Sequence, residues 1–126
     1  MYTPINSLVA TPSPASPGTV IAVVLTIQNN YSAPISILGD LTFTSGGVIY
    51  SITYDTRVSD TINSGLTMQI MGHFTMPNAA VTVTAHSYWY GSDGQWHLDD
   101  THTVSISVQQ LTVQISEFKI VDFNTY

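Results

Sequence analysis

The fold is decided by the stretch Val81-Thr-Val-Thr-Ala-His-Ser-Tyr-Trp-Tyr90, followed by Gly91-Ser-Asp-Gly94 and Gln95-Trp-His-Leu-Asp-Asp100. Apolar and polar residues alternate along its first segment, which is the period of a half-buried β-strand. The glycines that flank the Ser-Asp pair allow the chain to reverse there into a returning strand. We therefore expect a strand, a tight turn and a second strand over residues 81–100.

The rest of the chain consists of short β-prone segments between turn residues. Apolar residues nowhere recur at helical spacing, so we expect no substantial helix. Short strands separated by Gly, Pro and Asn turns are typical of an antiparallel sandwich. The other expected strands are Ile5–Ala10, Thr19–Asn29, Ile35–Thr44 with an interruption at Gly39-Asp40, Val48–Tyr54, Arg57–Asn63 as a short strand or a loop, Leu66–Phe74, and Thr101–Ile115 with a bulge or bend at Gln109-Gln110.

Length and composition indicate one domain. The 126 residues, 44% of them hydrophobic, suffice for one core and leave no room for a second domain. Cysteine is absent, which excludes thiol catalysis and Cys-based zinc sites. The longest apolar stretch, Val20–Leu25, is too short to span a membrane, and residues 1–6 do not resemble a signal peptide. We expect either cytoplasmic synthesis of the chain as written or a fragment of a longer secreted protein.

The chain is acidic and sparsely charged. Arg57 and Lys119 stand against eight Asp and Glu residues, which gives a net charge of −6. Nucleic acids and anionic membranes attract cationic surfaces, so we expect neither as a partner, and no membrane insertion. Charged residues make up 8% of the chain, against about 25% in an average soluble domain. Such a surface suits a fixed place in an assembly or outside a cell.

Residues 19–29 present two apolar faces. One face is expected to point into the core, and the predicted core residues on this and other strands are Ile21, Val23, Leu25, Val81, Val83, Val104 and Ile106. The opposite face begins with Val20, Ala22 and Val24, which is more apolar than a solvated face should be. Because exposed apolar patches mark contact sites, we predict that these three residues are assembly contacts.

The C-terminal residues extend beyond the strands that a sandwich needs. We expect a domain of residues 1–110 and a strand arm, 111–126, that belongs to the same domain or docks on a neighbour. Each large apolar side chain of the arm would forgo about 1.5–3 kcal/mol of burial in water. The arm therefore folds onto its own sheet edge or adds a strand to a neighbouring subunit. Its predicted contact residues are Phe118, Ile120, Val121, Phe123 and Tyr126.

Three segments carry a resemblance to a known class of domain. They are Pro17-Gly-Thr-Val-Ile-Ala-Val-Val-Leu-Thr-Ile-Gln-Asn29, the Ser64-Gly65 turn before a strand ending in Phe74-Thr-Met-Pro77, and the hairpin Tyr88-Trp-Tyr-Gly-Ser-Asp-Gly-Gln-Trp-His-Leu-Asp-Asp100. Over residues 17–108 the chain resembles the CARDB and related adhesion-type modules of prokaryotic surface proteins and virion proteins. The resemblance implies a non-enzymatic sandwich for presentation, spacing or attachment. The expected fold is all-β, an antiparallel immunoglobulin-like β-sandwich of seven to nine strands with a C-terminal strand extension.

One cluster has the side chains of a metal site, namely His97, Asp99, Asp100 and His102. On an extended strand the first two share one face and the last two the other, so convergence requires a turn at Asp99-Asp100. The favoured interpretation is that both aspartates cap such a turn through backbone N–H groups while the histidines face water. A hard ion such as calcium near Asp93, Asp99 and Asp100 is the alternative. We expect no metal and no cofactor.

No catalytic motif is present, and one small sandwich leaves little wall for a deep substrate cleft. We therefore expect no enzyme and name no catalytic residue. The aromatic residues Tyr88, Tyr90 and Trp96 are a candidate platform for stacking sugars. The favoured alternative is packing, with Trp89 and Trp96 as cross-strand partners that close one end of the core.

These features predict a non-enzymatic structural protein on a virion surface, as a decoration, turret or tail-associated protein. It would assemble through its sheet edges and its C-terminal arm, with itself or with a capsid or shell protein as partner. The alternative is a glycan- or protein-binding module of a secreted prokaryotic cell-surface protein, located outside the cell.

Overall fold

The computed structural model describes residues 1–110 and folds them into two antiparallel sheets of nine strands in total. The predicted all-β, immunoglobulin-like sandwich is confirmed. No helix in this part of the chain is long and apolar enough to cross a membrane. The strands are β1 Ile5–Thr11, β2 Val20–Gln28, β3 Ile35–Ser45, β4 Val48–Ser51, β5 Thr53–Tyr54, β6 Ser59–Ile62, β7 Thr67–Thr75, β8 Val81–Tyr90 and β9 Trp96–Ile106.

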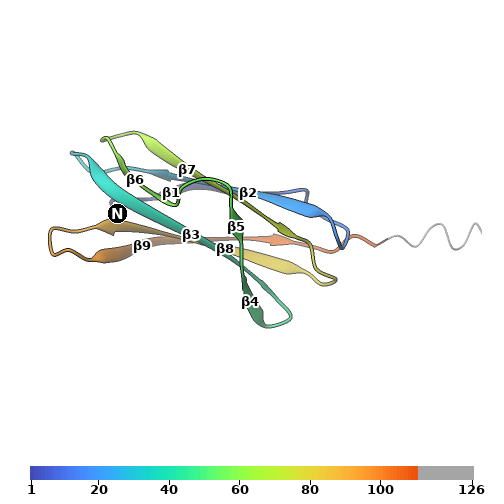
Figure 1. Cartoon of the computed structure of the whole chain (residues 1–126). Helices are drawn as coiled ribbons and strands as arrows, with labels where there is room; N and C mark the ends of the chain where they lie inside the picture. The colour runs from blue at the N-terminus through green and yellow to red at the C-terminus, as the bar shows by residue number, and fades with distance from the viewer. Residues whose placement is uncertain (111–126) are drawn as a thin grey trace, which may run out of the picture.

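The two sheets face each other as layers (Figure 1). One sheet has the strand order β1-β2-β7-β5, and the other has the order β4-β3-β8-β9 with β6 also paired to β3. β1 and β9 are thus edge strands of opposite sheets, and they lie against each other along one side of the sandwich. This side brings the N-terminal residues next to the β8–β9 hairpin, where Thr3 and Ile5 bond to Asp99 and Asp100.

The core lies between the sheets and is filled by the side chains that alternate inward along each strand. Of the predicted core residues, Val104 is half-buried and the others are buried, namely Ile21, Val23, Leu25, Val81, Val83 and Ile106. The strand phase read from the sequence is therefore confirmed in β2 and β8. The same phase leaves the opposite side of β2 facing outward.

β3 runs without a break through Gly39, so the predicted interruption of this strand is wrong. A Cβ atom added to Gly39 would lie 2.4 Å from Cδ1 of Ile70 and 2.9 Å from Cδ1 of Ile27. The missing side chain lets the facing sheet pack directly against the backbone of β3. Here glycine permits close packing between the sheets and does not reverse the chain.

The predicted strand Val48–Tyr54 is in fact two strands in different sheets. β4 pairs with β3, whereas β5 pairs with β7. Ile52, between them, is buried in the core and anchors the crossing. The Tyr54 hydroxyl then accepts a hydrogen bond of 2.8 Å from the N–H of Leu41, between the parts of β3 that pair with β6 and β4. The alternation of residues does not specify which sheet a strand joins, because both sheets share the same period.

The last strand of the described residues begins earlier than predicted. β9 begins at Trp96, not at Thr101, and ends at Ile106, whereas residues 111–115 of the predicted strand lie outside the described residues. Gln109 and Gln110 follow an isolated bridge between Ala15 and Val108 and belong to no strand, so no strand bulge occurs at them. The alternative prediction, a bend that leads into residues 111–115, reaches outside the described residues.

A bulge does occur earlier in β9. Ser87 pairs with Asp100 and Tyr88 with Leu98, which leaves Asp99 as the extra residue. Residues 111–126 lie outside the described residues. The predicted C-terminal arm, with its contacts Phe118, Ile120, Val121, Phe123 and Tyr126, belongs to this part.

Candidate binding surfaces

The outward side of β1, β2 and β7 carries apolar residues among polar residues without formal charge, and we call it the uncharged face. The predicted assembly contacts Val20, Ala22 and Val24 all lie on it, and Val20 is 60% exposed. Val24 is in register with Val9 on β1 and with Met71 on β7. Three apolar side chains therefore form a continuous row across three neighbouring strands.

The strands of this face contain no Asp, Glu, Lys or Arg. At its edge, Nδ1 of His73 lies 2.9 Å from Oδ1 of Asp55, which follows β5. The strands of the other sheet carry four aspartates, Asp40, Asp60, Asp99 and Asp100. Two of these, Asp99 and Asp100, bond to the N-terminal segment, whereas Asp40 lies beside His86 and Tyr88 on the outward side. Coulomb repulsion between two acidic copies is therefore weaker at the uncharged face than at a surface that includes Asp40.

The predicted ligand platform is divided by the structure. Tyr90 and Trp96 are direct cross-strand partners whose ring centroids lie 5.0 Å apart. The Tyr88 hydroxyl lies instead 3.3 Å from Oδ2 of Asp40. Desolvation and then the negative charge of Asp40 raise the pKa of Tyr88. Two members of the predicted platform are thus side by side, and the third is engaged with another strand.

The predicted pairing of the two tryptophans is wrong by one residue. Trp89 pairs with His97, and their rings stack with centroids 4.3 Å apart. Trp96 pairs with Tyr90 on the other side of the sheet. Because side chains alternate along a strand, Trp89 lies on the inward side of β8 and Trp96 on the outward side of β9.

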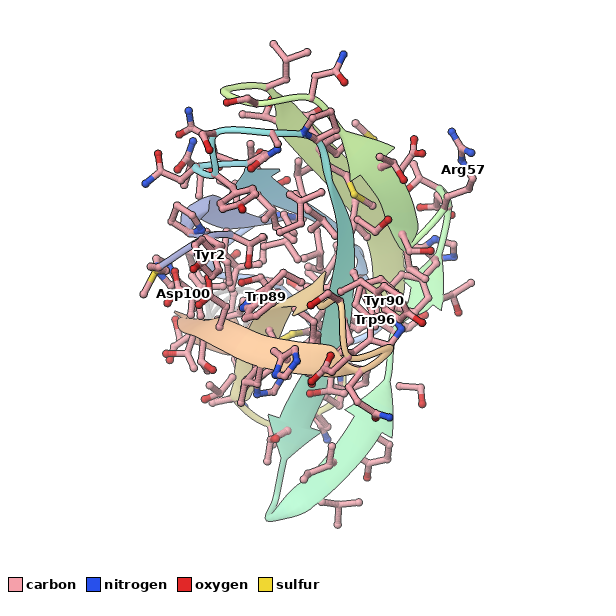
Figure 2. The ribbon with its side chains drawn as sticks, turned by 90° about the vertical axis from the view of Figure 1, so that its left-hand side faces the viewer. Tyr2, Arg57, Trp89, Tyr90, Trp96 and Asp100 are labelled. Carbon is pink, nitrogen blue, oxygen red and sulfur yellow. The ribbon has the colours of Figure 1, made fainter. Side chains whose placement is uncertain are left out.

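Four aromatic side chains line a groove of about 440 Å³ at one end of the sandwich, which we call the aromatic groove. Tyr2 precedes β1, Tyr31 lies between β2 and β3, and Trp89 and Tyr90 end β8. The Tyr2 ring stands edge-on to Tyr31 and to Trp89, with centroids 5.2 and 4.9 Å away. This end of the molecule faces the viewer in Figure 2, where Tyr2, Trp89 and Tyr90 lie across it.

The remainder of the groove mixes apolar residues, Pro34 and Ile35, with polar residues that carry no formal charge. Its lining includes Ser36 and Thr61, whose hydroxyl oxygens lie 2.9 Å apart, and Ser92 of the hairpin turn. Tyr2 and Tyr31 are absent from the predicted platform because no local pattern connects them with the hairpin. Only the folded chain brings these three distant segments together.

A buried asparagine holds the loop that carries Tyr31. Asn29 is fully buried, and its amide nitrogen donates to the carbonyls of Ala33 at 2.9 Å and Ile62 at 2.8 Å. Its Oδ1 atom accepts a hydrogen bond of 2.8 Å from the N–H of Tyr31. These bonds tie the connection between β2 and β3 to β6, so Tyr31 is held in place although its ring is exposed.

The predicted metal cluster is a set of hydrogen-bond acceptors for the N-terminal segment. Oδ2 of Asp99 accepts from the N–H of Thr3 at 2.6 Å and from its hydroxyl at 3.0 Å. Oδ2 of Asp100 accepts from the N–H of Ile5 at 2.8 Å. The predicted turn is wrong, because a bulge directs both carboxylates toward β1. Both aspartates accept bonds from backbone N–H groups, but these bonds cap no turn. Within the described residues, the only local one runs from the N–H of Thr101 to Oδ1 of Asp100 at 2.9 Å.

The two histidines of that cluster each lie beside an aspartate. Nε2 of His97 lies 2.9 Å from Oδ2 of Asp93, and this contact, followed by the Gln95 N–H, lowers the pKa of the Asp93 carboxyl. His97 also stacks on Trp89 and so does not simply face water as predicted. Nε2 of His102 lies 3.4 Å from Oδ2 of Asp100. Within residues 1–110, no three His, Cys, Asp or Glu side chains gather closely enough to hold a metal ion.

Comparison with known proteins shows the fold. No family model and no curated protein matches the sequence. The putative ApaA protein of Bordetella pertussis is similar in structure with a TM-score of 0.59 at 14% identity, over 86% of this chain and 95% of that one. Spo0M, a sporulation control protein of Bacillus subtilis, has a TM-score of 0.55 at 14% identity, over 88% and 51%.

The seventh PapD-like domain of human CEP192 is similar with a TM-score of 0.55 at 8% identity, over 88% of this chain and 87% of that domain. Its presence among the similar structures supports the immunoglobulin-like sandwich. At these identities the likeness extends to the fold alone.

Proposed function

We propose that this protein is a non-enzymatic structural subunit of a virion surface and that it assembles with copies of itself through the uncharged face. The supporting observation is the row of Val9, Val24 and Met71 on strands without formal charge. The side chain of Val9 is 47% exposed, that of Met71 is 40% exposed, and Val24 is half-buried. Exposed apolar rows of this kind are typical of contact surfaces. In a shell, part of the surface of each copy is covered by a fixed neighbour and needs fewer charged residues to stay in solution. This agrees with a chain in which 8% of the residues are charged. The resemblance to CARDB-type modules points to the same class of role and stays a prediction.

Charge restricts the orientations in which two copies can meet. Each chain carries a net charge of −6, so two copies repel each other at most orientations. A contact between two uncharged faces brings apolar rows together and leaves no carboxylate buried without a partner. A capsid or shell protein on the same face is the competing outcome of the experiment below.

The size of the face predicts a weak contact between isolated copies. Three strands about 4.8 Å apart, of seven, nine and nine residues at about 3.3 Å each, give a footprint of roughly 400 Å². A stable complex buries about 800 Å² per partner. Association through this face is therefore expected at micromolar to millimolar concentrations, and it strengthens where many copies are held in an array.

Sedimentation velocity of the full-length protein over that concentration range tests the proposal. We expect reversible self-association of the wild type and a monomer for Val24→Asp, because the substitution places a charge in the centre of the apolar row. The control is Thr103→Asp, which adds the same charge at an exposed site on β9 of the other sheet and should associate like the wild type. Electron microscopy of the concentrated wild type should show ordered oligomers.

Two results would contradict the uncharged face as a self-contact. One is a wild type that stays monomeric at millimolar concentration while binding a capsid or shell protein, which assigns the face to a different partner. The other is association that survives Val24→Asp but disappears when residues 111–126 are deleted, which assigns the contact to the C-terminal segment.

A further inference from the structure

The aromatic groove has the chemistry of a ligand site. Its side chains come from the N-terminal segment, the connection between β2 and β3, the start of β3, β6 and the β8–β9 hairpin. Tyr2, Tyr31 and Tyr90 are 41%, 42% and 45% exposed, although rings of this size contribute strongly to stability when they are buried. No residue in the lining carries a formal charge. A ligand that fits this groove is neutral, offers an apolar face to the rings, and carries hydroxyl groups for the polar rim.

We propose that the aromatic groove binds a neutral saccharide. A pyranose ring has an apolar face of C–H groups that stacks on aromatic side chains and an edge of hydroxyl groups that both donate and accept hydrogen bonds. The groove presents Tyr31 and Tyr90 for stacking, and Ser36 and Thr61 for hydrogen bonding. Each serine, threonine and tyrosine hydroxyl also both donates and accepts, so the two sets of groups are complementary.

The size and neutrality of the groove distinguish a saccharide from other ligands. A volume of about 440 Å³ lies in the range of about 300–1,000 Å³ that is usual for small-molecule sites. Nucleic acids stack on aromatic rings as well, but they require cations, and the lining has none. Proline-rich peptides also dock on aromatic grooves, yet they need an extended track along several residues. A proline-rich peptide is therefore the competing ligand in the test.

The groove is held in shape before a ligand arrives. Asn29 fixes the loop of Tyr31 through three hydrogen bonds, and Asp99 fixes Thr3, the neighbour of Tyr2. The ring of His97, which is not part of the groove lining, stacks on Trp89 and restricts the orientation of its indole. Binding then requires little ordering of side chains, which lowers its entropic cost.

Tryptophan fluorescence of the full-length protein provides the measurement. The chain contains two tryptophans, and Trp96 is not part of the groove lining, so Trp96→Phe leaves Trp89 as the only indole. This variant is titrated with neutral oligosaccharides of glucose, galactose, mannose and N-acetylglucosamine, and separately with a ten-residue polyproline peptide. We expect at least one oligosaccharide to change the emission of Trp89 with a saturable dependence, and the peptide to leave it unchanged.

Two further substitutions locate the site. Tyr31→Ala in the Trp96→Phe background should weaken saccharide binding roughly tenfold, which equals about 1.4 kcal/mol. The matched control is Tyr50→Ala, because Tyr50 is 45% exposed but stacks on Phe43 and belongs to β4, outside the groove. The control should change the dissociation constant less than about twofold.

The proposal is overturned if none of the oligosaccharides binds, if only polyproline binds, or if Tyr31→Ala and Tyr50→Ala have equal effects. It is independent of assembly, because Val24→Asp lies on the uncharged face and should leave saccharide binding intact. If the protein self-associates but binds no saccharide, this inference fails and the proposed function stands. If it binds a saccharide but stays monomeric, the proposed function fails and this inference stands.

Discussion

Asp100 and Ile5 join the two sheets of the sandwich, because Oδ2 of Asp100 accepts a hydrogen bond of 2.8 Å from the backbone N–H of Ile5. Ile5 begins β1 and Asp100 lies in β9, and these are the edge strands of opposite sheets. A carboxylate thus satisfies an N–H group at an edge that has no strand beside it. The bulge at Asp99 makes this possible, because it turns two consecutive carboxylates toward the N-terminal segment, Asp99 to Thr3 and Asp100 to Ile5.

Replacing Asp99 tests this link. Thr3 is fully buried, so Asp99→Ala leaves its N–H and its hydroxyl without their carboxylate partner. We expect a loss of roughly 1.5–3 kcal/mol in the free energy of unfolding, measured by urea denaturation. Asp99→Asn is the control, since it keeps an oxygen acceptor and should lose less. Equal stability of the alanine variant and the wild type would show that the contact does not close the sandwich.

Asn29 should contribute far more to the free energy of unfolding than its neighbour Asn30. Asn29→Ala leaves two carbonyls and the N–H of Tyr31 without side-chain partners, at an expected cost of roughly 2–4 kcal/mol in unfolding free energy. Asn30 is exposed, so Asn30→Ala should change stability by less than about 0.5 kcal/mol. Thermal unfolding of both variants compares them directly. If both variants lost equally little stability, Asn29 would not be the residue that holds the aromatic groove in shape.

Residues on the two faces of β2 should contribute differently to the free energy of unfolding. Leu25 is fully buried, so Leu25→Ala should lower the free energy of unfolding by roughly 2–4 kcal/mol through the cavity that it leaves. Val24 points outward, and Val24→Ala should cost less than about 1 kcal/mol at concentrations where the protein is monomeric. Urea denaturation of dilute protein measures both. Equal costs would mean that the strand phase is wrong.

Asp93 should make stability depend on pH at the acidic end. Its pKa is lower in the folded protein than its usual value, chiefly because of the contact with His97, so the folded state releases this proton more readily than the unfolded chain. The associated stability is present above about pH 4 and is lost as the pH falls through the folded pKa. Wild type should therefore melt higher than Asp93→Asn at pH 5, and the difference should shrink as the pH falls below about 4. A constant difference in melting temperature would exclude this linkage.

The local alternation of residues determined the class of fold. The period of two in Val20–Gln28 and Val81–Tyr90 identified both the strands and their buried faces, because side chains of a strand alternate between its two sides whatever its neighbours are. The same period placed Val20, Ala22 and Val24 on an outward apolar surface. The glycines at positions 91 and 94 identified the hairpin turn for an equally local reason.

Only the tertiary structure decided what is built on those strands. The crossing at Ile52, the bulge at Asp99 and the meeting of Tyr2, Tyr31 and Trp89 all depend on which strands pair and in which register. Strand pairing is decided by contacts between residues far apart in sequence, and a single extra residue in a bulge redirects the side chains beside it. The sequence alone therefore determined the sandwich and its apolar face, whereas the aromatic groove exists only once distant segments pack together.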